Sequence, residues 1–200
     1  DLSNDWRAAQ VAHVRAGLAE RPDICLEVTD AGGSTARNIL DIENLVAKGI
    51  DVLIVSPRDT VAMTPAIAAA HQAGVQVILL TRRILGDDYT TFIAPDDLQI
   101  ATQAATLMAE ELGGAGRILM IEGVPTATTA KKRAAGFLSR LADFPELQVV
   151  ERIAGNYLRS DALKGVQRVM EAGVAFDAIY AHSDSLAEGA RIALAAAGID

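Results

Sequence analysis

The chain has 200 residues, 50% of them hydrophobic, and carries 26 acidic and 18 basic side chains for a formal net charge of −8. This size and apolar content suit one large α/β domain or two small lobes. The acidic balance argues against a nucleic-acid-binding surface, which needs clustered lysines and arginines, and no apolar run approaches the roughly 20 residues of a membrane helix.

The first half of the chain alternates helical periodicity with short apolar runs. We predict helices at 6–20, 35–48 and about 60–73, and strands at 24–29, 51–56 and 75–80. The single cysteine, Cys25, lies in an apolar run and is predicted to be a buried thiol on a strand. The continuous apolar run 52–55 is typical of a strand buried on both faces. Gly32 and Gly33 lack the spacing of a phosphate-binding loop and predict a turn.

The second half repeats this alternation. We predict helices at about 98–112, 127–142, 159–172 and 184–197, and strands at 117–121, 147–153 and 176–181. Strands that alternate with helices of this length predict parallel sheets with right-handed crossovers. A short strand near residue 91 leads to Pro95, which breaks regular structure. We therefore predict an N-terminal lobe at 1–96 and a C-terminal lobe at 97–200, joined by a hinge.

Both ends of the sequence bear on the expected fold. A doubly wound fold normally begins with a central strand, but the first predicted element is a helix. No predicted strand follows the last helix to close the second sheet. We therefore expect the native polypeptide to extend beyond Asp1 and Asp200, with a first strand and closing strands outside this sequence. No signal peptide is visible, although a cleaved leader would leave the same sequence.

An ordered set of short motifs runs along the whole chain. The motifs are Asn4-Asp5-Trp6-Arg7, Gly49-Ile50-Asp51, Ser56-Pro57, Leu80-Thr81-Arg82, Asp96-Asp97, Gly123 with Arg133, Gly136 and Phe137, Tyr157 with Arg159, and Ser183-Asp184. Together they resemble the type I periplasmic sugar-binding proteins of ABC importers, in particular the ribose and galactofuranose binders. The resemblance implies an α/β fold of two doubly wound parallel-sheet lobes joined by a hinge.

The resemblance also implies a sugar-binding cleft between the lobes. Its lining is expected to consist of Asn4, Trp6, Arg7, Thr81, Arg82, Asp97, Arg133, Tyr157 and Ser183. Ligands of open α/β sheets bind beyond the carboxyl ends of the strands, and several of these residues directly follow predicted strands. Aromatic rings can cover the apolar face of a sugar, while guanidinium groups donate paired hydrogen bonds to its oxygens.

Several of these residues also have ordinary structural explanations. Trp6 and Tyr157 could belong to the core. Asp97 and Ser183 could cap the helices that begin after them, and a cap can still contact a ligand. Arg133 lies beside two lysines, as on a solvated helix face.

The expected lining departs from the family pattern. Of two adjacent arginines, Arg82 is expected to face the cleft and Arg83 the solvent. Thr81 stands where the family usually has an aspartate, which removes a strong acceptor for sugar hydroxyls. Asp97 and Ser183 replace common asparagines. The arginine-rich set that results suits a furanose with many acceptor oxygens, a sugar acid or a phosphate.

The sequence favours a binding protein over an enzyme. The three histidines, His13, His71 and His182, have no metal-ligand spacing, so we expect neither a metal nor a cofactor. Of the three, His71 is expected to be exposed and His182 to lie nearer the cleft. Ser183, His182 and Asp184 are adjacent and cannot easily adopt the geometry of a catalytic triad. A hydrolase or transferase is therefore disfavoured.

We predict a periplasmic receptor that captures a monosaccharide or related polyol between two closing lobes. Its second partner would be the membrane permease of an ABC importer, and this chain would not bind nucleic acid. The same fold serves as the ligand core of lac-repressor-type transcription factors and as the extracellular part of some sensor kinases. The alternative is therefore the ligand-sensing domain of a repressor or a sensor kinase.

Overall fold

The structure is a computed structural model that describes residues 2–199. It contains two parallel three-stranded sheets, which confirms the predicted α/β fold class. The first sheet has the order β1 (Val52–Val55), β2 (Gln76–Leu80), β3 (Thr91–Ile93), and the second has the order β5 (Glu146–Ala154), β4 (Ala115–Glu122), β6 (Ala178–Ala181). The helices are α1 (Asp5–Leu18), α2 (Thr35–Ala47), α3 (Thr60–Gln72), α4 (Asp97–Glu111), α5 (Thr128–Leu141), α6 (Arg159–Glu171) and α7 (Asp184–Ala196).

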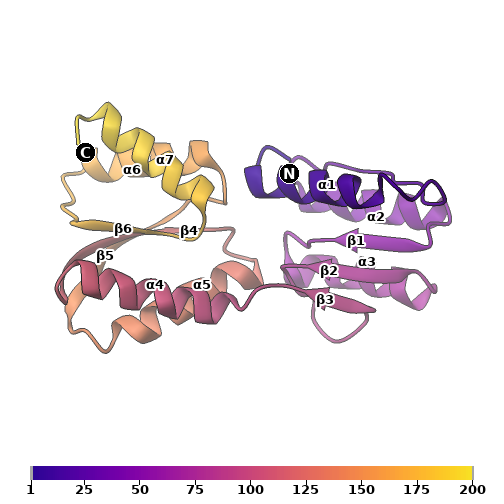
Figure 1. Cartoon of the computed structure of the whole chain (residues 1–200), viewed down its shortest axis with the longest axis horizontal. Coiled ribbons are helices and arrows are strands. Elements are labelled where there is room, and N and C mark those ends of the chain that lie inside the picture. The colour runs from indigo at the N-terminus through magenta and orange to yellow at the C-terminus, as the bar shows by residue number, and fades with distance from the viewer. Residues whose placement is uncertain (1, 200) are drawn as a thin grey trace.

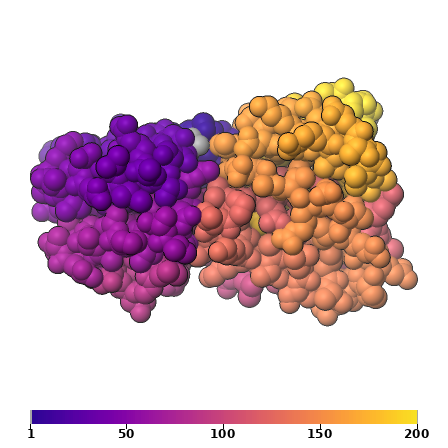
Figure 2. Space-filling model, turned by 180° about the vertical axis from the view of Figure 1, so that it is seen from behind, coloured from indigo at the N-terminus to yellow at the C-terminus, as the bar shows by residue number. Residues whose placement is uncertain are grey.

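Two lobes lie side by side, each built around one sheet (Figure 1). We call the elements from α1 to β3 the first lobe and those from α4 to α7 the second lobe. A space-filling view shows the lobes in contact along one boundary (Figure 2). Strand β3 ends at Ile93 and α4 begins at Asp97, so Pro95 lies in the connection. The division of the chain at residues 96 and 97 stays a prediction.

The core of the first lobe lies on one face of its sheet. Leu53 and Val55 of β1 are buried with residues of α2 and α3, among them Ile42, Met63 and Ile67. The alternate residues of β1, Val52 and Ile54, are 48% and 41% exposed. The prediction that this strand is buried on both faces is therefore wrong. Helix α1 has no buried residue along its length, so it does not seal the second face.

The predicted strand at 24–29 is also wrong. Among residues 2–199, β1 pairs with β2 alone, and the segment 24–29 has no strand pairing. A strand forms only where a neighbouring strand satisfies its backbone groups, and apolar residues by themselves do not supply that neighbour. Cys25 is consequently exposed rather than buried. Gly32 and Gly33 do form the predicted turn, with positive φ angles of 55° and 81°.

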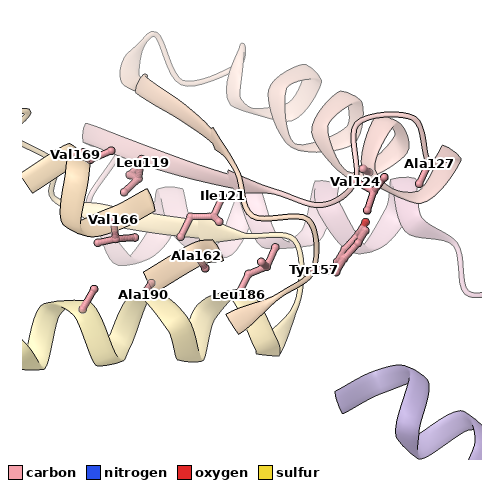
Figure 3. Close-up of a cluster of buried hydrophobic side chains, with 12 residues drawn as sticks. Leu119, Ile121, Val124, Ala127, Tyr157, Ala162, Val166, Val169, Leu186 and Ala190 are labelled. Atoms are coloured by element: carbon pink, nitrogen blue, oxygen red, sulfur yellow. The ribbon is translucent and has the colours of Figure 1, made fainter. Parts of the chain in front are cut away.

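The second lobe is packed on both faces of its sheet. Leu119 and Ile121 of β4 point toward α6 and α7, whereas Ile118 and Met120 point toward α4 and α5. Figure 3 shows the first of these clusters, with Tyr157 beside Val124 at one end. Glycine allows the helix pairs to approach closely, since a Cβ atom on Gly189 would lie 2.3 Å from a backbone oxygen of α6. No helix among residues 2–199 has the length and apolar character needed to cross a membrane.

Candidate functional site

Loops that follow strand ends in both lobes face one another where the lobes meet. Thr81 follows β2, Gly123 follows β4, Tyr157 lies three residues beyond β5 and His182 follows β6. All strands of each sheet are parallel, so their carboxyl ends share one edge. This is the edge at which open α/β sheets bind ligands.

Hydrogen bonds join the two lobes around this edge. The side-chain amide of Asn4, which caps α1, donates to the backbone oxygen of Tyr157. Thr129 Oγ1 donates to the backbone oxygen of Thr81 at 2.9 Å. Arg159 Nη2 lies 2.6 Å from Asp5 Oδ2. The first turn of α1 therefore lies beside the second lobe (Figure 1).

The first lobe contributes two arginines to this edge. Asn4 Oδ1 accepts from the backbone N–H of Arg7 at 3.1 Å, which fixes the start of α1. Arg7 Nη2 donates to Thr81 Oγ1 at 3.3 Å. Arg82 is only 7% exposed and donates from Nη1 to the backbone oxygen of Pro57 at 3.4 Å. Both guanidinium groups are thus held by neutral acceptors.

The second lobe contributes an ion pair and a ring. Arg133 Nε lies 2.9 Å from Asp97 Oδ1, and the same guanidinium donates to the backbone oxygen of His182. The ring of Tyr157 is buried, and its centroid lies 5.3 Å from Cζ of Arg82. That distance suits a cation–π contact across the lobes. Tyr157 therefore belongs to the core and also faces the arginines.

The helix cap at α4 differs from the expected one. Asp96, not Asp97, accepts the backbone N–H groups of Leu98 and Gln99, both at 3.1 Å. Asp97 sits one residue later, where its carboxylate is free to pair with Arg133. Ser183 holds the cap position of α7 but makes no side-chain capping bond.

The backbone is strained on both sides of the site. Thr81, Asn156 and Tyr157 have φ angles of 63°, 52° and 62°. A positive φ is uncommon for residues other than glycine and is a clear outlier for a β-branched threonine. Such strain costs of order 1–3 kcal/mol per residue and is concentrated at functional sites.

Burial changes the pKa of several groups here. Desolvation, followed by repulsion from Arg82, lowers the pKa of Arg7 to about 9. Desolvation also lowers the pKa of Arg82 and raises that of Tyr157. The pKa of His182 falls to about 4, first through desolvation and then through the charges of Arg133 and Arg152. His182 is therefore neutral near pH 7, and its Nδ1 accepts the backbone N–H of Gly123 at 3.2 Å.

The structure brings together most of the residues expected to line a cleft. These are Asn4, Arg7, Thr81, Arg82, Asp97, Arg133 and Tyr157, with Ser183 next to His182. Trp6 precedes Arg7 and is 56% exposed, so it is not a core residue. Arg83 is exposed, as expected, and lies 4.1 Å from the centroid of Phe92. The expected list left out His182 and Gly123, although Gly123 lay within a motif.

Across residues 2–199, no three histidine, cysteine, aspartate or glutamate side chains lie close enough to hold a metal. The groups at this edge are hydrogen-bond donors and rings, which recognise oxygen-rich molecules with apolar faces.

Comparison with known proteins assigns the family. One family model, described as "Periplasmic binding protein domain", matches residues 1–200. The chain belongs to this family. Membership confirms the resemblance drawn from the sequence motifs, and it agrees with a binding protein rather than an enzyme.

Similar proteins carry names of sugar and polyol binders. The chain is 30% identical over 173 residues to the ribose import binding protein RbsB of Bacillus subtilis, covering 86% of this chain and 56% of that one. It is 25% identical over 181 residues to a xylitol-binding protein of Mycolicibacterium smegmatis, covering 90% and 52%. The chain therefore spans about half the length of the curated relatives it matches.

Solved structures share the fold. A fructose-binding periplasmic domain of a hybrid two-component system superposes with a TM-score of 0.91 at 29% identity, over 97% of this chain and 65% of that one. A myo-inositol-binding protein of Caulobacter, bound to myo-inositol, gives 0.92 at 25% identity, over 100% and 69%.

Gly123 leaves the space that the Tyr157 ring occupies. A Cβ atom on Gly123 would lie 1.9 Å from Tyr157 Cζ. We predict that Gly123→Ala displaces this ring and weakens ligand binding by at least about tenfold, equal to about 1.4 kcal/mol. Isothermal titration calorimetry with a sugar or polyol that binds the wild-type protein measures the loss of affinity. Gly17→Ala is the control, because nothing lies within 4 Å of its added Cβ atom. Equal affinity in both variants would contradict this packing role.

His182 predicts a pH dependence of stability. Its pKa is about 4 in the folded chain and 6.5 in the reference state. The unfolded chain therefore takes up a proton first, so stability present above pH 6.5 is lost as the pH falls toward 4. The loss amounts to about 3 kcal/mol. Urea unfolding at several pH values should show a shallower decrease for His182→Asn than for wild type. His71→Asn is the control, and a slope like wild type in both variants would refute the assignment.

Proposed function

We propose that this protein is a solute receptor that holds a sugar or polyol between its two lobes. The observation that carries the proposal is the convergence of donors and rings from strand ends of both lobes. The names of its relatives support it, since they include ribose and xylitol binders. By analogy with those relatives, the protein works in the periplasm and delivers its ligand to the membrane permease of an ABC importer.

The nine expected residues take complementary roles in this proposal. Arg7, Arg82 and Arg133 donate hydrogen bonds to ligand oxygens. Tyr157 and the exposed indole of Trp6 cover apolar ring faces. The remaining members, Asn4, Thr81, Asp97 and Ser183, supply amide, hydroxyl and carboxylate groups around them.

Ligand binding would favour the closed arrangement of the lobes. Pro95 lies in the connection between β3 and α4, where a hinge at residues 96 and 97 lets the lobes separate. A ligand that touches both lobes binds the closed form better and shifts the population toward it. The permease would then recognise the closed form.

A sensory role is the second candidate. One solved structure of the same fold is a fructose-binding domain of a hybrid two-component system. In that setting lobe closure would be transmitted to a kinase. A kinase or a DNA-binding motif encoded in the same polypeptide would favour sensing, whereas permease genes beside it would favour import.

Trp6 offers a direct test of sugar binding. Differential scanning fluorimetry with pentoses, hexoses, furanoses, polyols and sugar acids should identify a compound that raises the unfolding temperature. Trp6→Ala should weaken its binding by at least about tenfold, because stacking on the indole and the apolar area it covers together contribute about 1.4 kcal/mol or more. Trp6→Phe keeps an apolar ring and should retain most of the affinity. A screen with no stabilising compound would count against the proposed function, and an unchanged shift in Trp6→Ala would remove Trp6 from the site.

A further inference from the structure

We propose that the ligand of this site is an anionic sugar derivative, a sugar acid or a sugar phosphate, whose charged group binds between Arg7 and Arg82. This inference rests on the proposed function and narrows its ligand class. It follows from the balance of charges at the edge where the lobes meet.

Positive charge exceeds negative charge at this edge. Arg133 is paired with Asp97, and the side chains of the pair are 21% and 4% exposed. Asp5 is engaged by Arg159. Within residues 2–199, neither Arg7 nor Arg82 forms an ion pair with a carboxylate.

The contacts of the two arginines are all neutral. Arg7 donates to Gln10 Oε1 at 2.6 Å and to Thr81 Oγ1 at 3.3 Å. Arg82 donates to the backbone oxygen of Pro57 and faces the ring of Tyr157. Thr81 Oγ1 accepts from Arg7, and a carboxylate oxygen in the same place would have neutralised the charge of Arg7.

Arg82 is buried and Arg7 half-buried, and neither is paired with a carboxylate of residues 2–199, so their charges destabilise this arrangement. Burial without a charged partner is costly for any ion, and here the two guanidinium groups also repel each other. Desolvation is the main cause that lowers the pKa of both arginines. Repulsion from Arg82 adds to it at Arg7, and the charges of Arg58 and Arg133 add to it at Arg82, where Tyr157 and Asp97 act in the opposite direction. A carboxylate or phosphate group would compensate this charge, whereas sugar hydroxyls supply dipoles only.

Four buried polar atoms of residues at this edge have no hydrogen-bond partner among the described residues. They are Arg82 Nε, Tyr157 Oη, His182 Nε2 and Ser183 Oγ. A guanidinium binds an oxyanion best through two parallel N–H groups, and Nε belongs to such a pair. The other three atoms can pair with the hydroxyls of the same ligand. The site therefore matches a molecule that combines an anionic group with a hydroxylated ring.

Matched compounds test the charge requirement. Titration calorimetry with galactose, galacturonate and galactose 6-phosphate compares a neutral, a carboxylate and a phosphate group on one ring. Glucose with its acid and phosphate, and ribose with ribonate and ribose 5-phosphate, extend the series. We expect at least one anionic member to bind at least about tenfold more tightly than its neutral parent, since hydrogen bonds to charged groups are the stronger ones. Whichever of the carboxylate and the phosphate binds more tightly on the same sugar shows which of the two anionic groups the site recognises.

The outcomes separate this inference from the proposed function. Neutral sugars that bind as tightly as their anionic partners would overturn the charge requirement and leave sugar binding intact. A series in which no compound binds would overturn both. A carboxylate or phosphate that binds equally well without any sugar attached would also overturn the inference.

Adjacent arginines supply the matched variants. Arg82→Gln should weaken binding of the anionic ligand by at least about tenfold, and exposed Arg83→Gln by less than about twofold. Arg82→Gln removes an uncompensated buried charge, so its unfolding temperature without ligand should equal or exceed that of wild type. Arg7→Gln repeats the test at the second cation if Arg82→Gln does not fold. Equal losses in the Arg82 and Arg83 variants would contradict the proposal.

Discussion

The burial of Arg82 between the lobes is the constraint on which the site depends. Its guanidinium is 7% exposed and faces the Tyr157 ring of the other lobe. No carboxylate among the described residues pairs with it. A charge in this position is expensive unless a partner compensates it. The burial of Arg82 therefore supports a binding site in which the ligand supplies the negative charge that no described residue places against it.

Several features of the fold make this burial possible. The parallel strands of both sheets end at the meeting edge, so loops from both lobes converge there. Gly123 leaves room for the Tyr157 ring, and strained backbone at Thr81 and Tyr157 turns these residues into the site. Packing on both faces of β4 makes the second lobe a rigid support. Strained backbone lowers the stability of the fold, so its presence at these positions supports a binding role for them.

The sequence predicted the second lobe better than the first, for a physical reason. Every strand there has a paired neighbour, and β4 is covered by helices on both faces, so periodicity and burial agree. In the first lobe the apolar segment 24–29 has no pairing partner within residues 2–199. Local pattern cannot reveal whether a partner strand is present. It could not distinguish Asp96 from Asp97 as the helix cap either, because both residues suit that position.

The most direct test follows the Arg82 guanidinium itself. Nuclear magnetic resonance of protein labelled on arginine nitrogen reports each protected Nε–H group, and the spectrum of Arg82→Gln assigns the Arg82 signal. Addition of the tightest anionic sugar should move this signal, because Nε gains an oxyanion partner. Its neutral parent at the same concentration should move the signal less, because it binds more weakly and brings no oxyanion, and sodium chloride at matched ionic strength should leave it in place. An unmoved Arg82 signal while that ligand raises the unfolding temperature would contradict the account.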